Sequence, residues 1–202
     1  MIDTSLRRHA AAAERNRGPI LEVLRRVLPA QGLVLELASG SGLHVVFFAK
    51  ALPALRFQPS DPDPEARASI RAWSTHEGLS NVADPLALDA TASTWPLDRA
   101  DAVLCSNMIH IAPWAATQGL MTHAARLLPS GAPLVLYGPY RRGGAHTAPS
   151  NESFDASLRA RDPAWGVRDL EAVTALAQTS GLLLDEVVEM PANNLTVVFR
   201  RE

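Results

Sequence analysis

The chain has 202 residues, of which 47% are hydrophobic and 20% are charged, a composition that predicts one globular domain and excludes a disordered or fibrous chain. Its 19 Lys and Arg residues against 21 Asp and Glu residues give a net charge of −2, which excludes a strongly basic nucleic-acid-binding surface but not a local basic patch. The single cysteine, Cys105, excludes a disulfide framework and a thiolate zinc cluster.

The expected location follows from what the sequence lacks. The longest apolar stretch, 43–55, is interrupted by His44, Lys50 and Pro53, so it falls short of a membrane-spanning helix. The first residues carry charges but no apolar centre of a secretory signal. We therefore expect a cytoplasmic protein without a membrane or nucleic-acid partner, and the oligomeric state stays open.

Apolar runs typical of strands alternate with longer helical patterns, and this alternation predicts a parallel sheet with helices on its faces. In the first half we expect a helix at 20–28, a strand at 33–37, a helix at 43–52, a strand at 56–59, a helix at 64–77 and a strand at 86–88. In the second half we expect a strand at 101–106, a helix at 114–128, a strand at 133–137, a helix at 168–179, and strands at 182–189 and 196–200.

The end of the chain defines the expected topology. Residues 190–195 are too few for a crossover, so the final strand must run antiparallel to its predecessor. A three-layer, doubly wound α/β fold with seven strands, the seventh antiparallel and inserted beside the fifth, is typical of class I methyltransferases. Residues 138–165 form a polar insert, partly helical from Phe154, of the kind that usually makes binding loops or lids. We expect one domain, 1–202, in which segment 1–30 and the insert 138–165 flank the cleft.

The turn after the first expected strand, 38–42, reads Ala-Ser-Gly-Ser-Gly, and its glycines let the backbone lie against a ligand. A nicotinamide fingerprint would need glycine at the position of Leu43 or Val45, and a phosphate-binding P-loop would need lysine directly after Gly42. The turn therefore fits an adenosyl ligand without a pyrophosphate, namely S-adenosylmethionine.

Three acidic residues end adjacent expected strands, where open α/β sheets bind ligands. Glu36 is placed near the methionine ammonium, directly or through water; Asp61 can accept from both ribose hydroxyls; and Asp89 can accept from the adenine amine. An acidic residue after a strand is often only a helix cap, and Asp63 is the rival of Asp61 for the ribose role.

The fourth expected strand leads into residues 106–114, where this fold places the transferable methyl group. Methyl transfer is an in-line displacement, so the protein orients the reactants, excludes water and supplies a base only where the nucleophile needs one. His110 is the candidate base, with a histidine bonded to backbone at a helix start as the alternative. Asn107 and Met108 are candidate cofactor contacts, and Trp114 either lines the pocket or packs.

The polar insert and its borders carry hydrogen-bonding side chains that could orient a small polar substrate, and arginine would favour a carboxylate or phosphate. The candidate substrate-binding residues are Tyr137, Arg141, Asn151, Asp155, Trp165 and Arg168, and Tyr140 joins His110 as a candidate catalytic residue. The alternative is a solvated loop whose arginines pair with aspartates. The six histidines have no ligand-type spacing, so we expect no metal.

Many short stretches together resemble, almost end to end, the class I methyltransferase-like family that contains methyltransferase-like protein 26. The matching stretches are Ala13-Glu14-Arg15-Asn16, Gly18-Pro19-Ile20, 36–42 with His44, Gln58-Pro59-Ser60-Asp61, Asn107-Met108-Ile109-His110-Ile111, Tyr137-Gly138-Pro139-Tyr140, Ser150-Asn151, Phe154-Asp155, Asp162-Pro163, Trp165-Gly166-Val167-Arg168-Asp169 and Met190-Pro191-Ala192-Asn193-Asn194. The resemblance implies a seven-stranded methyltransferase fold and S-adenosylmethionine binding. The residues that it assigns to the cofactor site are Glu36, Gly40, Gly42 and Asp61, with Arg15 and Asn16 contacting cofactor or substrate. We expect Ala38, Ser39 and His44, which lie in or beside the same turn, to contact the cofactor as well. Ala38 stands where the wider class I signature has its first glycine.

We therefore predict an S-adenosylmethionine-dependent methyltransferase that acts on a small polar or anionic molecule and releases S-adenosylhomocysteine. A nicotinamide reductase lacks support because the fingerprint glycine is missing, and an aminopropyl transferase lacks support because strand four carries no acidic residues for a polyamine. The alternative from another class is a methyltransferase-like subunit that binds cofactor or a partner without catalysis.

Overall fold

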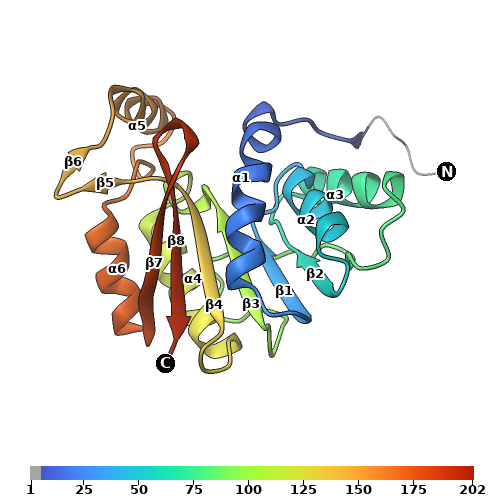
Figure 1. The fold of residues 1–202 in the computed structure, drawn as a ribbon. Helices are drawn as coiled ribbons and strands as arrows, with labels where there is room; N and C mark the ends of the chain where they lie inside the picture. Colours follow the sequence, from blue (N-terminus) through green and yellow to red (C-terminus); the bar gives the residue numbers. More distant parts are fainter. Residues whose placement is uncertain (1–5) are drawn as a thin grey trace.

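A computed structural model describes residues 6–202, so the first five residues of the expected segment 1–30 lie outside it. A central sheet of six strands has the order β2-β1-β3-β4-β8-β7 (Figure 1). The strands are β1 Gly32–Leu37, β2 Leu55–Pro59, β3 Ala102–Ser106, β4 Pro133–Pro139, β7 Leu182–Met190 and β8 Asn194–Arg201. The first four are parallel, and β8 runs antiparallel between β4 and β7, as predicted.

Helices cover both faces of this sheet. They are α1 Ala11–Val27, α2 Leu43–Ala51, α3 Pro64–His76, α4 Trp114–Leu127 and α6 Leu170–Thr179. Helix α5 Pro149–Arg161 lies beyond the end of the sheet, near a small hairpin of β5 Arg141–Arg142 and β6 Ala145–His146 (Figure 1). Short 3-10 turns lie at Met108–His110 and Pro191–Asn193. One core packs α1, α2 and α3 against the sheet, and the other packs α4 and α6. Neighbouring strand residues such as Val34 and Leu35 therefore enter opposite cores.

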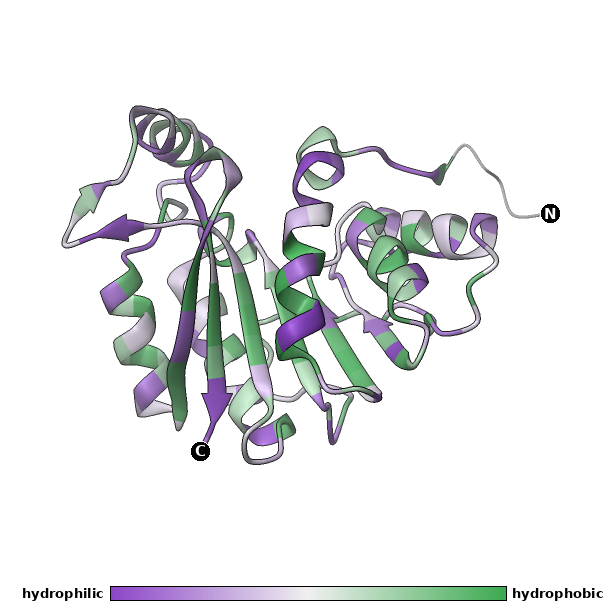
Figure 2. Cartoon of the chain, in the orientation of Figure 1, coloured by the Kyte–Doolittle hydropathy of each residue, from purple (hydrophilic) through white to green (hydrophobic). Residues whose placement is uncertain are grey.

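Because both faces are covered, the inner strands are apolar along most of their length. Figure 2 shows hydrophobic residues concentrated on the central strands and hydrophilic ones on the β5–β6 hairpin. No helix among residues 6–202 is long and apolar enough to cross a membrane.

The expected strand at 86–88 is wrong, which leaves six strands in the sheet rather than seven. The chain from Asn81 to Leu86 runs beside β2 and exchanges four backbone hydrogen bonds with the segment from Phe57 to Asp61, but they form only isolated bridges. Pro59 and Pro85 have no N–H to donate, so each proline interrupts the ladder.

Two helix boundaries also differ from expectation. The first helix begins at Ala11 rather than at Ile20, with Pro19 inside it. Pro19 cannot donate to the carbonyl of Arg15, but the apolar face around Leu24 is buried, and this packing maintains the helix across the lost bond. In the insert, α5 begins at Pro149, earlier than Phe154.

Candidate functional site

The turn between β1 and α2 has a backbone that bends in the left-handed region at three residues. Ala38 has a φ of 54°, Gly40 of 54° and Gly42 of 86°. Ala38 adopts this left-handed conformation at the steric cost of its Cβ. A Cβ on Gly42 would lie 2.9 Å from the Cα of Ile70, so glycine at this position lets α3 pack directly against the turn.

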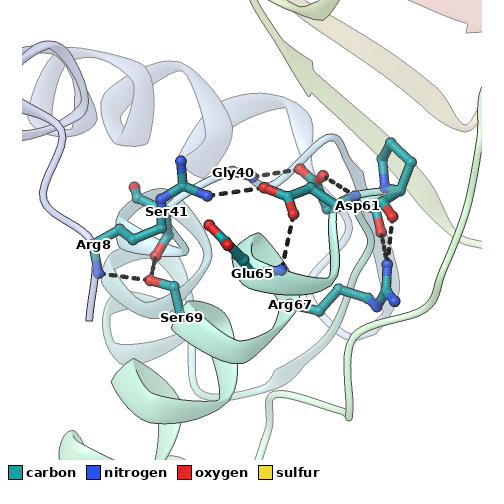
Figure 3. Close-up of polar contacts among 9 residues, drawn as sticks. Arg8, Gly40, Ser41, Asp61, Glu65, Arg67 and Ser69 are labelled. Carbon is teal, nitrogen blue, oxygen red and sulfur yellow. Dashed lines mark hydrogen bonds and ion pairs between the residues drawn. The ribbon is translucent and has the colours of Figure 1, made fainter. Parts of the chain in front are cut away.

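Asp61 lies just after β2 and is hydrogen-bonded to the backbone of the turn. Its carboxylate accepts the Gly40 N–H at 2.9 Å and the Asp63 N–H at 2.9 Å (Figure 3). A carboxylate has about four acceptor positions, so both oxygens keep capacity for ligand hydroxyls. Asp63, the rival residue, instead caps α3 by accepting the Glu65 N–H at 2.9 Å.

Glu36 lies on β1 with only 2% of its surface exposed. Its Oε2 has no hydrogen-bond partner in the described part of the chain. Burial raises the pKa of this carboxyl to about 7; a hydrogen bond from Ser39 opposes the shift and the charge of Asp61 adds to it. An unpartnered buried acceptor is costly, so the geometry fits a donor or cation that arrives with a ligand.

A cavity of about 420 Å³ opens at the carboxyl ends of β1, β2 and β3. It is lined by Leu37, Ala38, Asp61, Pro62, Leu88, Asp89, Ala90, Thr91, Met108, Ile111, Ala112, Pro113 and Ala116. Asp89 reaches this wall from a loop rather than from a strand, and its carboxylate accepts the Thr91 N–H and hydroxyl, both at 2.8 Å. The cavity thus brings together Ala38, Asp61, Asp89 and Met108, four of the residues predicted to bind the cofactor.

Three other predicted residues meet one another at the start of α2. The ring Nε2 of His44 lies 2.7 Å from Oδ1 of Asn16. An amide oxygen only accepts, so the ring nitrogen donates. Asn16 also hydrogen-bonds Tyr137, whose pKa burial raises, and Arg15 lies exposed beside them. Burial and the charge of Arg17 lower the pKa of His44 to about 4.

His110 and Tyr140 are sealed inside the protein. His110 is 0% exposed, and its Nδ1 accepts the Arg168 N–H at 3.2 Å. Its proton therefore resides on Nε2, which is buried and has no partner among residues 6–202. Burial and the charge of Arg168 lower the pKa of His110 to about 3. This ring has no free lone pair for a substrate proton, so the geometry gives no support to the base role.

Tyr140 packs edge-on against His110, with ring centroids 5.1 Å apart. Its hydroxyl is buried without a partner in the described chain, and burial raises its pKa. Asn107, three residues before His110, has a left-handed φ of 61°. A Cβ built on Gly138 would lie 2.6 Å from Nε2 of His110 and 3.2 Å from Oδ1 of Asn107, so both side chains pack against the backbone of Gly138.

The predicted substrate-binding residues of the insert mostly bind the protein itself. Asn151 donates to the carbonyl of Asn193 at 2.9 Å, which ties α5 to the β7–β8 connection. Asp155 accepts from Val167 N–H at 2.6 Å and from Arg159 at 2.9 Å. Although burial acts in the opposite direction, these bonds hold the pKa of Asp155 below its usual range.

Arg168 uses its guanidinium on three backbone carbonyls, those of Ile109, Ala112 and Ala164, at 2.7–2.9 Å. Arg141 donates to the carbonyl of Gly144. Trp165 lies under the guanidinium of Arg161 at 4.9 Å. No group of three His, Cys, Asp or Glu side chains is arranged for a metal ion within residues 6–202.

A family model described as "Protein of unknown function (DUF938)" matches residues 7–201. The chain belongs to the DUF938 family. The fold of this DUF938 protein is similar to the folds of solved methyltransferases, which confirms the predicted resemblance to the methyltransferase fold.

Three of these structures give the extent of the likeness. The O-methyltransferase family protein from Burkholderia thailandensis has a TM-score of 0.79 and 17% identity, over 92% of this chain and 56% of that one. The O-methyltransferase family 2 protein from Planctomyces limnophilus, in complex with apigenin, has a TM-score of 0.81 and 19% identity, over 95% and 58%. An SAH-bound methyltransferase of calicheamicin biosynthesis has a TM-score of 0.74 and 18% identity, over 92% and 54%. The DUF938 chain therefore spans little more than half the length of these proteins.

Sequence reasoning missed Ser69, which supports the site from inside α3. Its hydroxyl donates to the carbonyl of Ser41 at 2.7 Å and accepts the N–H of Arg8 at 2.8 Å. A serine within a helix has no motif, so only the packing of α3 on the turn identifies it. Sequence reasoning did not single out the apolar lining residues Pro62, Ile111 and Pro113 as individual site residues.

Proposed function

We propose that this DUF938 protein is an S-adenosylmethionine-dependent methyltransferase that acts on a small polar or anionic molecule. The observation that carries the proposal is the unpartnered, buried carboxylate of Glu36 near the end of β1, directly before Leu37 and the left-handed Ala38, both of which line a cavity at the carboxyl ends of β1, β2 and β3. Its support comes also from the class I methyltransferase fold, one of whose solved examples is SAH-bound. Cytoplasmic location stays a prediction.

The residues present fit this cofactor. Glu36 would face the methionine ammonium, which supplies the donor that the buried oxygen lacks, and Asp61 would accept from the ribose hydroxyls. Asp89, which lines the same cavity, would accept from the adenine amine while Met108 packs on the base. The cofactor supplies a methyl group on a sulfonium, which a nucleophile can attack directly.

The protein's part in the reaction is to orient the acceptor and to exclude water. Arg15, Asn16 and Tyr137 would orient the acceptor, with the positive charge of Arg15 selecting an anionic group. Because His110 offers no free lone pair and Tyr140 is sealed, an acceptor atom that is nucleophilic without deprotonation fits best. The side chains of the insert would act on the acceptor indirectly, because they hold the backbone that borders the acceptor's position. These residues are Arg141, Asn151, Asp155, Trp165 and Arg168.

Calorimetric titration of the purified protein with S-adenosylmethionine, S-adenosylhomocysteine and NAD tests the cofactor assignment. We expect micromolar binding of the first two ligands and no heat with NAD. Binding of NAD alone, or of none of the three, would overturn the proposal.

A second assay separates an enzyme from a non-catalytic cofactor-binding subunit. The protein with S-adenosylmethionine is incubated with panels of small carboxylates, thiols and amines, and S-adenosylhomocysteine is quantified. Release above the acceptor-free blank supports the methyltransferase, whereas tight cofactor binding without release from any panel favours the non-catalytic alternative.

A further inference from the structure

One hydroxyl joins the N-terminal part of the chain to the glycine turn. Ser69 lies in α3 with 0% of its surface exposed. Its Oγ accepts the backbone N–H of Arg8 at 2.8 Å and donates to the carbonyl of Ser41 at 2.7 Å. A serine hydroxyl can donate and accept at once, so residues 7–10, the N-terminal strap, are linked to the turn through a buried atom.

The side chain of Arg8 makes a second link to the same site. Its Nη1 donates to Oδ2 of Asp63 at 2.9 Å, the Asp63 N–H donates to Asp61, and Asp61 accepts the N–H of Gly40. Gly40 and Ser41 are neighbours in the chain, so these contacts close a ring that runs from the strap through Asp63, Asp61, the turn and Ser69 back to the strap (Figure 3). The strap is therefore linked to Asp61 through Asp63 and to the turn through Ser69.

The strap is also seated on α3 by Trp73. The indole Nε1–H of Trp73 donates to the carbonyl of Arg8 at 3.0 Å. The ring of His9 packs edge-on against Trp73 with centroids 5.1 Å apart, and the guanidinium of Arg7 lies 4.8 Å from its ring centre. These contacts hold the backbone of residue 8 where its N–H reaches Ser69.

The two links in the ring differ in strength. The Arg8–Asp63 ion pair has side chains that are 52% and 44% exposed, so solvent screens it and its contribution is small. The Ser69 hydroxyl is fully buried, and its removal leaves the Ser41 carbonyl without that donor and the Arg8 N–H without that acceptor. Ser69 is therefore the stronger connection.

We propose that Ser69 is a positioning residue of the cofactor site, and that docking of the N-terminal strap and binding of the adenosyl ligand are cooperative through it. The inference rests on the proposed function, since it takes the turn and Asp61 as the ligand's contacts. Ordering these groups before binding lowers the entropic cost of binding. Thermodynamic linkage requires that the ligand stabilise the docked strap by the same factor by which the strap raises affinity.

Titration calorimetry with S-adenosylhomocysteine tests this on the full chain and three variants. Ser69→Ala should weaken binding about 5- to 20-fold, and Arg8→Ala about 2-fold because its backbone N–H is retained. Lys50→Ala is the matched control for Arg8→Ala. Like Arg8, Lys50 is an exposed cation that pairs with a carboxylate at an end of α3, here Glu77 at 2.9 Å, but this pair lies outside the ring. Its affinity should equal that of the wild type.

Hydrogen exchange of residues 7–10, measured with and without S-adenosylhomocysteine, needs no variant and so does not depend on Ser69→Ala folding. In the wild type the ligand should slow exchange of the strap by a factor similar to the affinity loss in Ser69→Ala, and this protection should vanish in that variant. If the wild type binds the ligand but the exchange rate of the strap does not change, the coupling is overturned and the proposed function stays intact. An unchanged Kd in folded Ser69→Ala would have the same meaning. A wild type that does not bind the ligand would overturn both.

Discussion

The region at the turn after β1 and the region under the insert differ in whether their polar side chains lie beside a cavity. At the turn after β1, the Glu36 carboxylate lacks a partner, and Asp61 keeps acceptor capacity beside a cavity of about 420 Å³. Under the insert, His110 is enclosed, while Asn151 and Asp155 have used their hydrogen bonds on the protein. The first region thus has carboxylate oxygens with acceptor capacity left for the proposed ligand, and the polar side chains of the second region hold the protein's own backbone in place. Substitutions of the acidic side chains in the first region should therefore change ligand affinity, and substitutions in the second region should change stability without changing ligand affinity.

The largest expected effect is at Gly42. Gly42→Ala should lower the free energy of unfolding by about 2–4 kcal/mol, because its Cβ would meet the Ile70 backbone at 2.9 Å and its φ is 86°. Gly40→Ala is the control: its Cβ meets nothing within 4 Å, so only the left-handed conformation costs about 1–2 kcal/mol. Urea unfolding measures both, and equal losses would show that α3 does not press on the turn.

The unpartnered carboxylate gives the next effect, through pH. The pKa of Glu36, raised by burial to about 7, lies above the ordinary value of 4.5. The unfolded chain binds fewer protons between these values, so stability is present below pH 4.5 and lost as the pH rises through 7. That loss is on the order of 3 kcal/mol.

Glu36→Gln should remove this loss and make the ligand-free variant more stable than the wild type at pH 8 relative to pH 5, while weakening S-adenosylhomocysteine binding. Urea unfolding at the two pH values checks the first effect. A variant and wild type whose stabilities differ equally at both pH values would contradict it.

Asp61→Ala should weaken S-adenosylhomocysteine binding by about 1.5–3 kcal/mol, as expected for hydrogen bonds to a charged acceptor. Asp185→Ala is the matched control, because that carboxylate pairs with Arg200 across β7 and β8, away from the cavity. Titration calorimetry measures the Kd of both variants, and circular dichroism identical to that of the wild type shows that they are folded. An unchanged Kd in folded Asp61→Ala would mean that this residue does not contact the ligand.

His110→Gln tests the enclosed region. The variant should lose about 1–3 kcal/mol of stability because the N–H of Arg168 loses its acceptor, while the Kd for S-adenosylhomocysteine changes little. Burial lowers the pKa of His110 from its ordinary value of 6.5 to about 3. The contribution of this residue to the free energy of unfolding is therefore complete above pH 6.5 and is lost as the pH falls toward 3. Turnover abolished at unchanged stability would restore the base role.

The smallest effect is expected at Asn151. Asn151→Ala should cost about 1 kcal/mol of stability by breaking its bonds to Asn193 and Thr147, without a change in ligand affinity. Glu152→Ala, at an exposed position of the same helix, should be near neutral. Thermal unfolding and acceptor kinetics separate the cases: a raised KM at wild-type stability would make Asn151 a substrate contact instead.

The sequence predicted the sheet order near the chain end and the glycine turn because short connections and glycine patterns act locally. It did not predict that Pro59 and Pro85 would both fall on the ladder of the expected strand at 86–88, since pairing partners are set by the fold. Burial of His110 and the hydroxyl bridge of Ser69 are likewise tertiary outcomes. Residue type revealed which groups could do chemistry, and packing decided which of them face a cavity.

A crystal structure of the protein with S-adenosylhomocysteine tests the central claim most directly. The account predicts the adenine between Asp89 and Met108, the ribose hydroxyls on Asp61 and the ammonium within hydrogen-bond distance of Glu36. Ligand density outside this cavity, for example in the groove between α1, α2 and α3 lined by Phe47 and Trp73, would contradict it.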